Sequence, residues 1–316
     1  MRLLLVVTLT AMLVLGGIWV FAAQMIERTV AAQIAGSPQL RGRVTPVTGF
    51  PLALRSTIEG PRWLARDGRT GWQAPELGIE AASFRPNRVT ARFPTDQVLR
   101  IEGVDTRAGV ADMTATIEAA LDQTLREAAL DMAAATFEPP LLVSGIDAGA
   151  FLLRQVADTG YLLEGDVTAM RLAPDVLSLI PPQALPGATL SLRTVQADLH
   201  FAQALPLRGP LPDILSVTLR SAALDWGDLQ MTAKGALNRN PSGLIDGAID
   251  LTLADWQPFH ALLVAQGILP PDAAFLASMF FAGQSEPGTN RITLPVHFRD
   301  SVISLGPFAL AQLPQF

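Results

Sequence analysis

Hydrophobic residues occupy every second position over most of the chain after Pro38. Between residues 52 and 59 the leucines and isoleucine alternate with Arg55, Thr57 and Glu59, and residues 88–93 repeat the pattern. A period of two is typical of strands that have one buried and one solvated face. The pattern therefore predicts half-buried β-strands, most simply in antiparallel sheets.

The alternation is clearest late in the chain. Residues 229–233 and 245–253 alternate on either side of an Asn-Arg-Asn-Pro-Ser-Gly stretch at 238–243, which predicts a hairpin with a longer loop. Residues 292–298 form another strand, and Pro295 places it at an edge or an irregularity because proline cannot donate to a ladder.

An irregularity is also expected between residues 190 and 201. The apolar positions there switch parity between Leu192 and Val195, and a β-bulge is the simplest explanation. From Asp112 to Ala135 apolar residues fit both a four-residue and a two-residue period. We favour strands there over a helix.

Two short helices are predicted near the end. Asp255 is suited to cap a helix that has Pro258 in its first turn and ends at Gly267. Pro271 and Asp272 open a second helix, which is expected to end before Gly283.

These elements predict an α+β fold, with an N-terminal transmembrane helix followed by a mainly antiparallel β-sheet domain with a few short helices. We expect an anchor and stalk over residues 1–36, a β-rich half over 37–145, and a β-rich half with two short helices over 146–316. The internal boundary is placed near residues 140–150 because proline-rich loops punctuate the middle of the chain.

The first residues carry a different pattern, an unbroken apolar run from Leu3 to Ala23. A helix of that length spans roughly 30 Å, the thickness of the hydrocarbon core of a bilayer. A signal peptide cut before Ala23 is the alternative, but its apolar region is usually only about 7–15 residues long. We favour an uncleaved anchor, and consider a buried core helix the least suitable interpretation because the run has no polar face.

The charges beside this run predict its orientation. Arg2 lies before it, whereas Glu27 and Arg28 cancel after it, which favours a cytoplasmic N-terminus. We therefore expect a single-pass inner-membrane protein with the bulk of the chain in the periplasm.

Composition restricts the chemistry. The chain has no cysteine, which excludes disulfides, zinc–thiolate sites and cysteine nucleophiles.

From Glu27 to Arg107 there are 12 arginines against 8 acidic residues, whereas from Ala108 onward there are 10 basic against 21 acidic residues. The basic segment either rests on anionic lipid head groups or forms polar strand faces. The acidic overall charge and the lack of a dense basic stripe disfavour nucleic acid as a partner.

No catalytic or cofactor motif is present in the sequence, so no catalytic, cofactor-binding or metal site is predicted. His200, His260 and His297 lie on separate predicted elements, and packing or solvated roles are favoured for them. A group of aspartates is better explained as a solvated strand face than as a cation site. Its members are Asp225, Asp228, Asp246, Asp250 and Asp255.

Several turns and strand starts resemble an uncharacterised bacterial family, domain of unknown function 2125. They are Gly49-Phe50-Pro51, Trp72 with Ala74-Pro75, the run from Phe84 to Val89, Gly235, Gly243, Gly247, and Ser304-Leu305-Gly306-Pro307. The resemblance implies a membrane anchor and an envelope location in Gram-negative bacteria, and it defines no functional residue. A looser similarity to AsmA-type periplasmic proteins is an analogy of fold alone.

The expected function is therefore non-enzymatic: binding or handling of lipid or another amphipathic envelope ligand. Apolar strand faces outnumber the helices available to cover them, and an uncovered face can form a groove. A scaffold that binds another envelope protein is the alternative.

Overall fold

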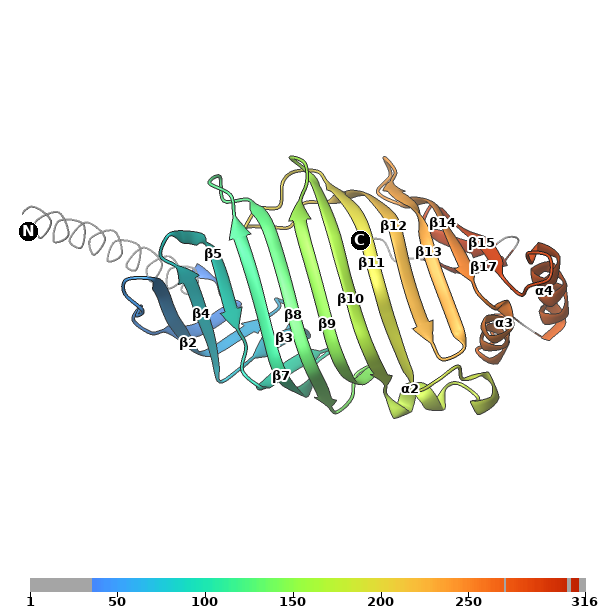
Figure 1. Cartoon of the computed structure of the whole chain (residues 1–316), viewed down its shortest axis with the longest axis horizontal. Helices are drawn as coiled ribbons and strands as arrows, with labels where there is room; N and C mark the ends of the chain where they lie inside the picture. Colours follow the sequence, from blue (N-terminus) through green and yellow to red (C-terminus); the bar gives the residue numbers. More distant parts are fainter. Residues whose placement is uncertain (1–35, 270, 306–307, 313–316) are drawn as a thin grey trace, which may run out of the picture. The chain divides into compact units, whose positions relative to one another are not determined.

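The computed structural model describes residues 36–269, 271–305 and 308–312 (Figure 1). The apolar run and most of the stalk lie outside these residues. Within them, no helix is long and apolar enough to cross a membrane. The predicted mainly antiparallel β-structure with a few short helices is confirmed.

The chain divides into two compact units. Unit 1 comprises the chain up to Asp122 together with Arg126–Pro139, and unit 2 comprises Gln123–Leu125 and Pro140 onward. Each unit is built around antiparallel strands that pair mostly with their neighbours along the chain.

Unit 1 is a meander whose middle strands are interrupted. Its strands are β1 (Leu40–Val44), β2 (Ala53–Leu64), β3 (Gly71–Gln73), β4 (Glu76–Ala82), β5 (Arg85–Arg92), β6 (Asp96–Ile101), β7 (Val104–Ala119) and β8 (Leu125–Glu138). β3 and β4 both pair with β2, and β5 and β6 both pair with β7. Each pair of short strands therefore acts as one long strand with a break in it.

The breaks lie side by side and form what we call the break line. It passes through Gly60–Pro61 in β2, Ala74–Pro75 between β3 and β4, residues 93–95 between β5 and β6, and residues 110–113 of β7. Gly60 N donates to Pro75 O (2.8 Å), and Val110 N donates to Thr95 O (2.8 Å), so the strands stay joined across it. Four residues of β7 face three residues of the β5–β6 segment, which makes a bulge, and bulges bend sheets.

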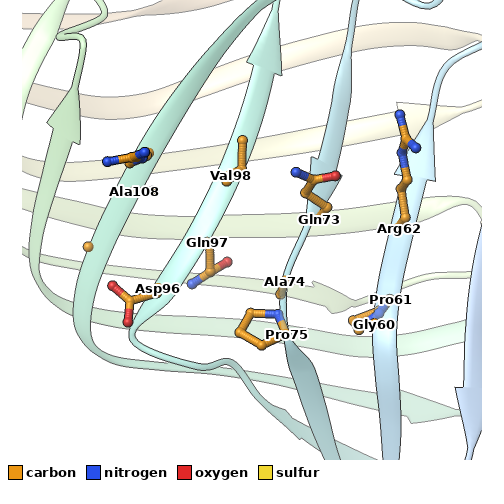
Figure 2. A pocket seen from close by; sticks show the side chains of 12 residues that line it. Gly60, Pro61, Arg62, Gln73, Ala74, Pro75, Asp96, Gln97, Val98 and Ala108 are labelled. Carbon is orange, nitrogen blue, oxygen red and sulfur yellow. The ribbon is translucent and has the colours of Figure 1, made fainter.

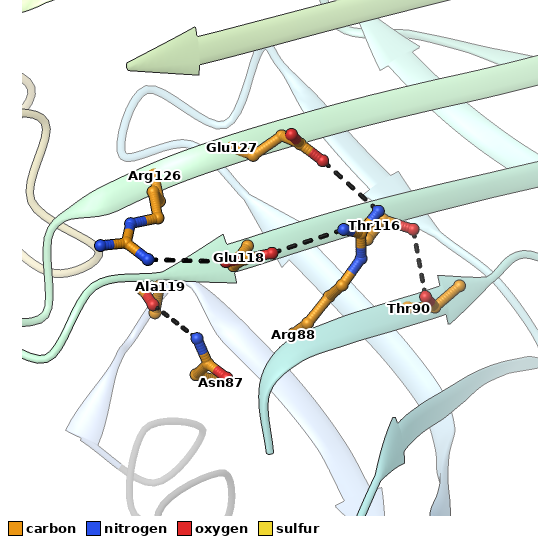
Figure 3. Close-up of polar contacts among 8 residues, drawn as sticks. All are labelled: Asn87, Arg88, Thr90, Thr116, Glu118, Ala119, Arg126 and Glu127. Carbon is orange, nitrogen blue, oxygen red and sulfur yellow. Dashed lines mark hydrogen bonds and ion pairs between the residues drawn. The ribbon is translucent and has the colours of Figure 1, made fainter. Parts of the chain in front are cut away.

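The two faces of unit 1 differ. Leu54 on β2 and Ala81 on β4 are buried together, with Val47 and Val89 packed against them. The opposite face carries ion pairs between neighbouring strands. Arg88 on β5 reaches both Glu118 on β7 and Glu127 on β8 (Figure 3).

Unit 2 is a longer meander in which each strand pairs with the next. Its strands are β9 (Val143–Gln155), β10 (Gly160–Leu172), β11 (Thr189–Phe201), β12 (Ile214–Trp226), β13 (Leu229–Arg239), β14 (Ile245–Leu253), β15 (Ile292–Arg299), β16 (Val302–Leu305) and β17 (Phe308–Gln312). The hairpin predicted around residues 238–243 is the β13–β14 connection.

The helices of unit 2 lie at two connections. The main pair is α3 (Trp256–Ala265) and α4 (Pro271–Gln284), between β14 and β15, and the shorter α2 (Pro174–Ser178) and the 3-10 turn η1 (Pro182–Ala184) connect β10 to β11. Asp255 caps α3 as predicted, accepting a hydrogen bond from Gln257 N at 2.9 Å. α4 runs through Gly283 to Gln284, two residues beyond the predicted end.

The predicted irregularities are present. The β11–β12 register shifts between Leu192 and Thr194, which is the expected bulge. Pro295 pairs with Asp250 on β14. The pairing of β15 with β16 begins only at the next residue, Val296, so the missing N–H of Pro295 lies at the end of the β15–β16 ladder. The ambiguous segment 112–135 forms parts of two strands, β7 and β8.

Candidate functional site

One face of the unit 2 sheet is apolar across seven strands. The register aligns one residue from each of β9 to β15 in a single row. The row consists of Leu153, Leu163, Ala197, Leu219, Gly235, Ile249 and Val296. We call this surface the apolar face.

The neighbouring rows are mainly polar and point the other way, because side chains alternate along each strand. On β12 Thr218 is exposed while Leu219 is half-buried, and on β13 exposed and half-buried residues alternate without interruption from Gln230 to Asn238. Lys234 lies on the polar face opposite Asp250. The opposite face is therefore mainly polar, although Leu162 on it is buried.

Helices α3 and α4 cover one end of the apolar face. Leu253 on β14 and Leu294 on β15 are 0 and 1 % exposed there, packed with Phe281 of α4 and Leu263 of α3. The helices contact β13 and β15. This is the largest hydrophobic cluster described in the chain, and it uses the same strands as the apolar row.

A second area of the apolar face is covered by the segment after β11. Tyr161 on β10 is fully buried, with its ring edge-on to Phe201 at 5.5 Å. Its hydroxyl donates to Leu125 O and accepts from Leu205 N, both at 3.0 Å. The hydroxyl therefore joins three segments that are distant in sequence.

Between these two areas most of the apolar side chains are only half-buried, with Ala197 as a buried exception. The half-buried side chains include Leu163, Val195, Leu219, Leu237 and Ile249. We call this part of the face the open strip. Along β13 the strip from Ala233 to Leu237 is about 13 Å long, given about 3.3 Å per residue.

A cavity lies at one end of the open strip, around the ends of β12 and β13 that are remote from the helices. Its volume is about 340 Å³, and apolar side chains dominate its wall. Leu215 and Ile214, at 47 and 45 % exposed, line it, together with Val217 and Leu237 of the apolar face. Arg239 and Asp213, an ion pair at 2.8 Å, also line this cavity.

The three histidines remain on separate elements. His200 and His297 are exposed on the polar strand face. His260 lies inside the helical pair, where Nε2 is 2.9 Å from Ala274 O and the ring is edge-on to Trp256 and Phe281. The described residues do not bring these histidines together.

The grouped aspartates also separate into individual roles. Asp255 caps α3, and Asp225 forms an ion pair with Arg193. Asp246 accepts hydrogen bonds from Asp300 N at 2.7 Å and from Asn240 Nδ2 at 3.0 Å. These bonds, the backbone bond first, lower the pKa of Asp246. In the part of the chain that the structure describes, no three histidines and carboxylates are grouped to hold a metal ion.

Comparison with known proteins adds the family. A model described as "Uncharacterized protein conserved in bacteria (DUF2125)" matches residues 19–314. The chain belongs to this family. The predicted family is thereby confirmed for DUF2125. No curated protein and no solved structure matches the chain, so the analogy to AsmA-type proteins stays a prediction.

Sequence reasoning found the alternation but not the open strip. Strand periodicity shows that Leu219 and Ile249 face the same way as their own neighbours, yet it does not show which part of a face the helices cover. The cavity residues around Leu215 directly follow the proline-rich loop at 205–212. That loop was the sequence feature that could have pointed to the cavity.

Proposed function

We propose that this DUF2125 protein is a non-enzymatic envelope protein that binds an acyl chain of a lipid on the open strip of unit 2. The observation that carries the proposal is the difference in burial along one continuous apolar face. Leu253 and Leu294, which pack with the helices, are 0 and 1 % exposed, whereas Leu163, Leu219 and Ile249 on the same face are only half-buried.

An acyl chain suits the dimensions and chemistry of the strip. A lipid tail within one leaflet extends about 15 Å, half the hydrocarbon thickness. The strip is about 13 Å long on β13 and continues into the cavity. Burying apolar area there contributes about 25 cal/mol per Å² removed from water.

The cavity end suits the polar part of such a lipid. Arg239 is 30 % exposed beside Asp213, and Asn238 also lines the cavity. Charged and amide groups beside an apolar pocket are the usual means of orienting an amphipathic ligand.

The proposal includes the membrane location expected from the sequence. The apolar run 3–23 supports a single N-in span, which would hold the bulk of the chain beside the outer leaflet of the inner membrane. An anchored protein would meet lipid as its most abundant amphipathic neighbour.

The test uses the full chain in its bacterial host. A photoreactive phenylalanine analogue is placed at Leu219 on the open strip or at Thr218, the adjacent position on the polar face. After irradiation, intact-mass spectrometry identifies the adducts. We expect lipid adducts at position 219 and none above background at position 218.

Two results would overturn the proposal. Equal lipid labelling at both positions would indicate non-specific contact with the bilayer. Labelling of position 219 by a protein and not by lipid would favour the alternative, an envelope scaffold that docks a partner on the same strip.

A further inference from the structure

Three arginines of unit 1 lie in one cross-strand row, and none of them forms an ion pair with another described residue. Arg41 on β1 is directly opposite Arg62 on β2, and the register continues from Arg62 through Gln73 and Val98 to Arg107 on β7. Like charges directly opposite each other destabilise a sheet. The pairing of Arg41 with Arg62 therefore costs stability unless an anion offsets it.

Other arginines of unit 1 are arranged differently. Arg43, Arg55, Arg88 and Arg92 each form an ion pair with a glutamate on an adjoining strand. The neighbouring carboxylate Asp105 is bound by Arg100 through two hydrogen bonds of 2.7 and 2.9 Å. Hydrogen bonding from Arg100 lowers the pKa of Asp105, and the charge of Arg62 adds only a smaller effect.

A cavity of about 590 Å³ opens between Arg62 and Arg107, on the break line. Arg62 and Arg107 belong to its wall. Gln73 and Val98 lie on the next two strands from Arg62 and also line the cavity (Figure 2). The interrupted strands shape it: the Gly60–Pro61 and Ala74–Pro75 breaks form one side of the wall.

The cavity also contains a carboxylate. Asp96 lines it from β6, is exposed, and forms no ion pair with any residue that the structure describes. Buried Gln97 beside it is already occupied, because it accepts from Trp72 Nε1 at 2.8 Å and donates to Pro94 O at 3.1 Å. The wall thus offers two guanidinium groups, one primary amide and one separate carboxylate.

We propose that this cavity binds a phosphate ester that also carries an ammonium group, of the phosphoethanolamine class. Arg62, Arg107 and Gln73 bind the phosphate, since guanidinium groups are the preferred partners of phosphate oxygens. Asp96 binds the ammonium group. The ester is either the head group of a phospholipid or its free, water-soluble counterpart. This site lies within unit 1 and does not depend on the acyl-chain proposal.

The binding test uses the full chain in dodecyl maltoside micelles, which contain no phosphorus, at low salt. Line broadening in ³¹P NMR reports binding of glycerophosphoethanolamine, with glycerophosphate as the ester that lacks the ammonium group. We expect the R62Q/R107Q variant to lose roughly tenfold or more in affinity for both esters, because two charged donors to the phosphate are removed.

Two single variants complete the design. D96N is expected to weaken glycerophosphoethanolamine while leaving glycerophosphate unchanged or tighter. R92Q is the matched control, because Arg92 is an exposed arginine of the same unit that is paired with Glu80, and it should change neither affinity. Hydrogen exchange of β6 and β7 checks that each variant is folded.

The source of the ester is decided by lipid analysis of the same preparations. Retention of phosphatidylethanolamine by the unaltered chain but not by R62Q/R107Q indicates a membrane lipid, whereas binding of the soluble ester alone indicates a free metabolite. Unchanged affinity in R62Q/R107Q, or no binding of either ester, overturns the proposal. Equal binding of both esters together with no effect of D96N overturns the ammonium part of it.

Discussion

Unit 1 breaks its strands at glycines and prolines, whereas unit 2 has nine sequential strands of which the first four are 13 residues long. In unit 1 the buried cluster around Leu54 is small and the cross-strand ion pairs are many. In unit 2 a helical pair covers a large core at one end of the sheet and leaves the open strip beside it. Both units are meanders, but their surfaces are shaped differently. Strand breaks shape the surface of unit 1, whereas in unit 2 the helices cover only part of the apolar face.

Packing of helices on a face, and not the alternating strand pattern, decides where a sheet is stable. Leu253 and Ile249 lie on one strand and one face, yet only Leu253 is completely buried. The free energy of unfolding should therefore be concentrated beneath α3 and α4, and be lower elsewhere.

The largest expected effect is on the free energy of unfolding, when a buried leucine is removed from the core of either unit. Leu253→Ala should destabilise unit 2 by about 2–5 kcal/mol, and Leu54→Ala should destabilise unit 1 by an amount near the lower end of that range, since its smaller cluster loses fewer contacts. Hydrogen exchange of the full chain in detergent measures each unit separately. Thr252→Ala, on the opposite face from Leu253, is the control and should cost little. A larger loss for Leu54→Ala than for Leu253→Ala would contradict the comparison.

A smaller effect is expected for the buried polar side chains that join segments in each unit. Tyr161→Phe removes the hydroxyl that bridges Leu125 O and Leu205 N, and should cost about 1–3 kcal/mol in unit 2 alone. Gln97→Met removes the bonds to Trp72 and Pro94 and should cost a similar amount in unit 1 alone. Exchange protection that fell in both units for either variant would show that the units do not unfold independently.

The smallest expected effect is on the loss of stability of unit 2 at acidic pH. The pKa of Asp246 is lowered in the folded chain, so its stabilisation of unit 2 is fully present above the ordinary value of 3.8 and is lost as the pH falls through the lowered value. Urea unfolding followed by circular dichroism between about pH 5 and pH 3 should show this loss, and Asp246→Asn should reduce it. Asp250→Asn, on the same strand, is the control. An identical acid response in the unaltered chain and Asp246→Asn would contradict the assignment.

Local patterns predicted much of the fold. Alternation located the strands around Leu54, Val89, Met231 and Leu251, and the cap at Asp255 located α3, because these signals depend only on neighbouring residues. The parity switch at Leu192 even located a bulge. Helix α2 and the precise end of α4 were not predicted, since one is a single short turn and the other continues through a glycine.

The candidate sites could not be predicted in the same way. The open strip depends on which strands α3 and α4 contact, and the arginine row depends on the register that aligns Arg62 with Arg107 across 45 residues of sequence. Prolines 61, 75 and 94 were visible in the sequence. Their alignment across neighbouring strands, which shapes the cavity, follows only from the pairing.

The neighbour-to-neighbour pairing in unit 2 also has a consequence for how the chain is made. Strands joined by hairpins need only short loops to be closed, so little chain entropy is lost at each step, and low contact order favours rapid folding. Each strand from β10 to β15 can add to the one before it as soon as it has been synthesised. The helical pair arrives late, between β14 and β15, so we expect growth of the sheet to precede the burial that fixes its end.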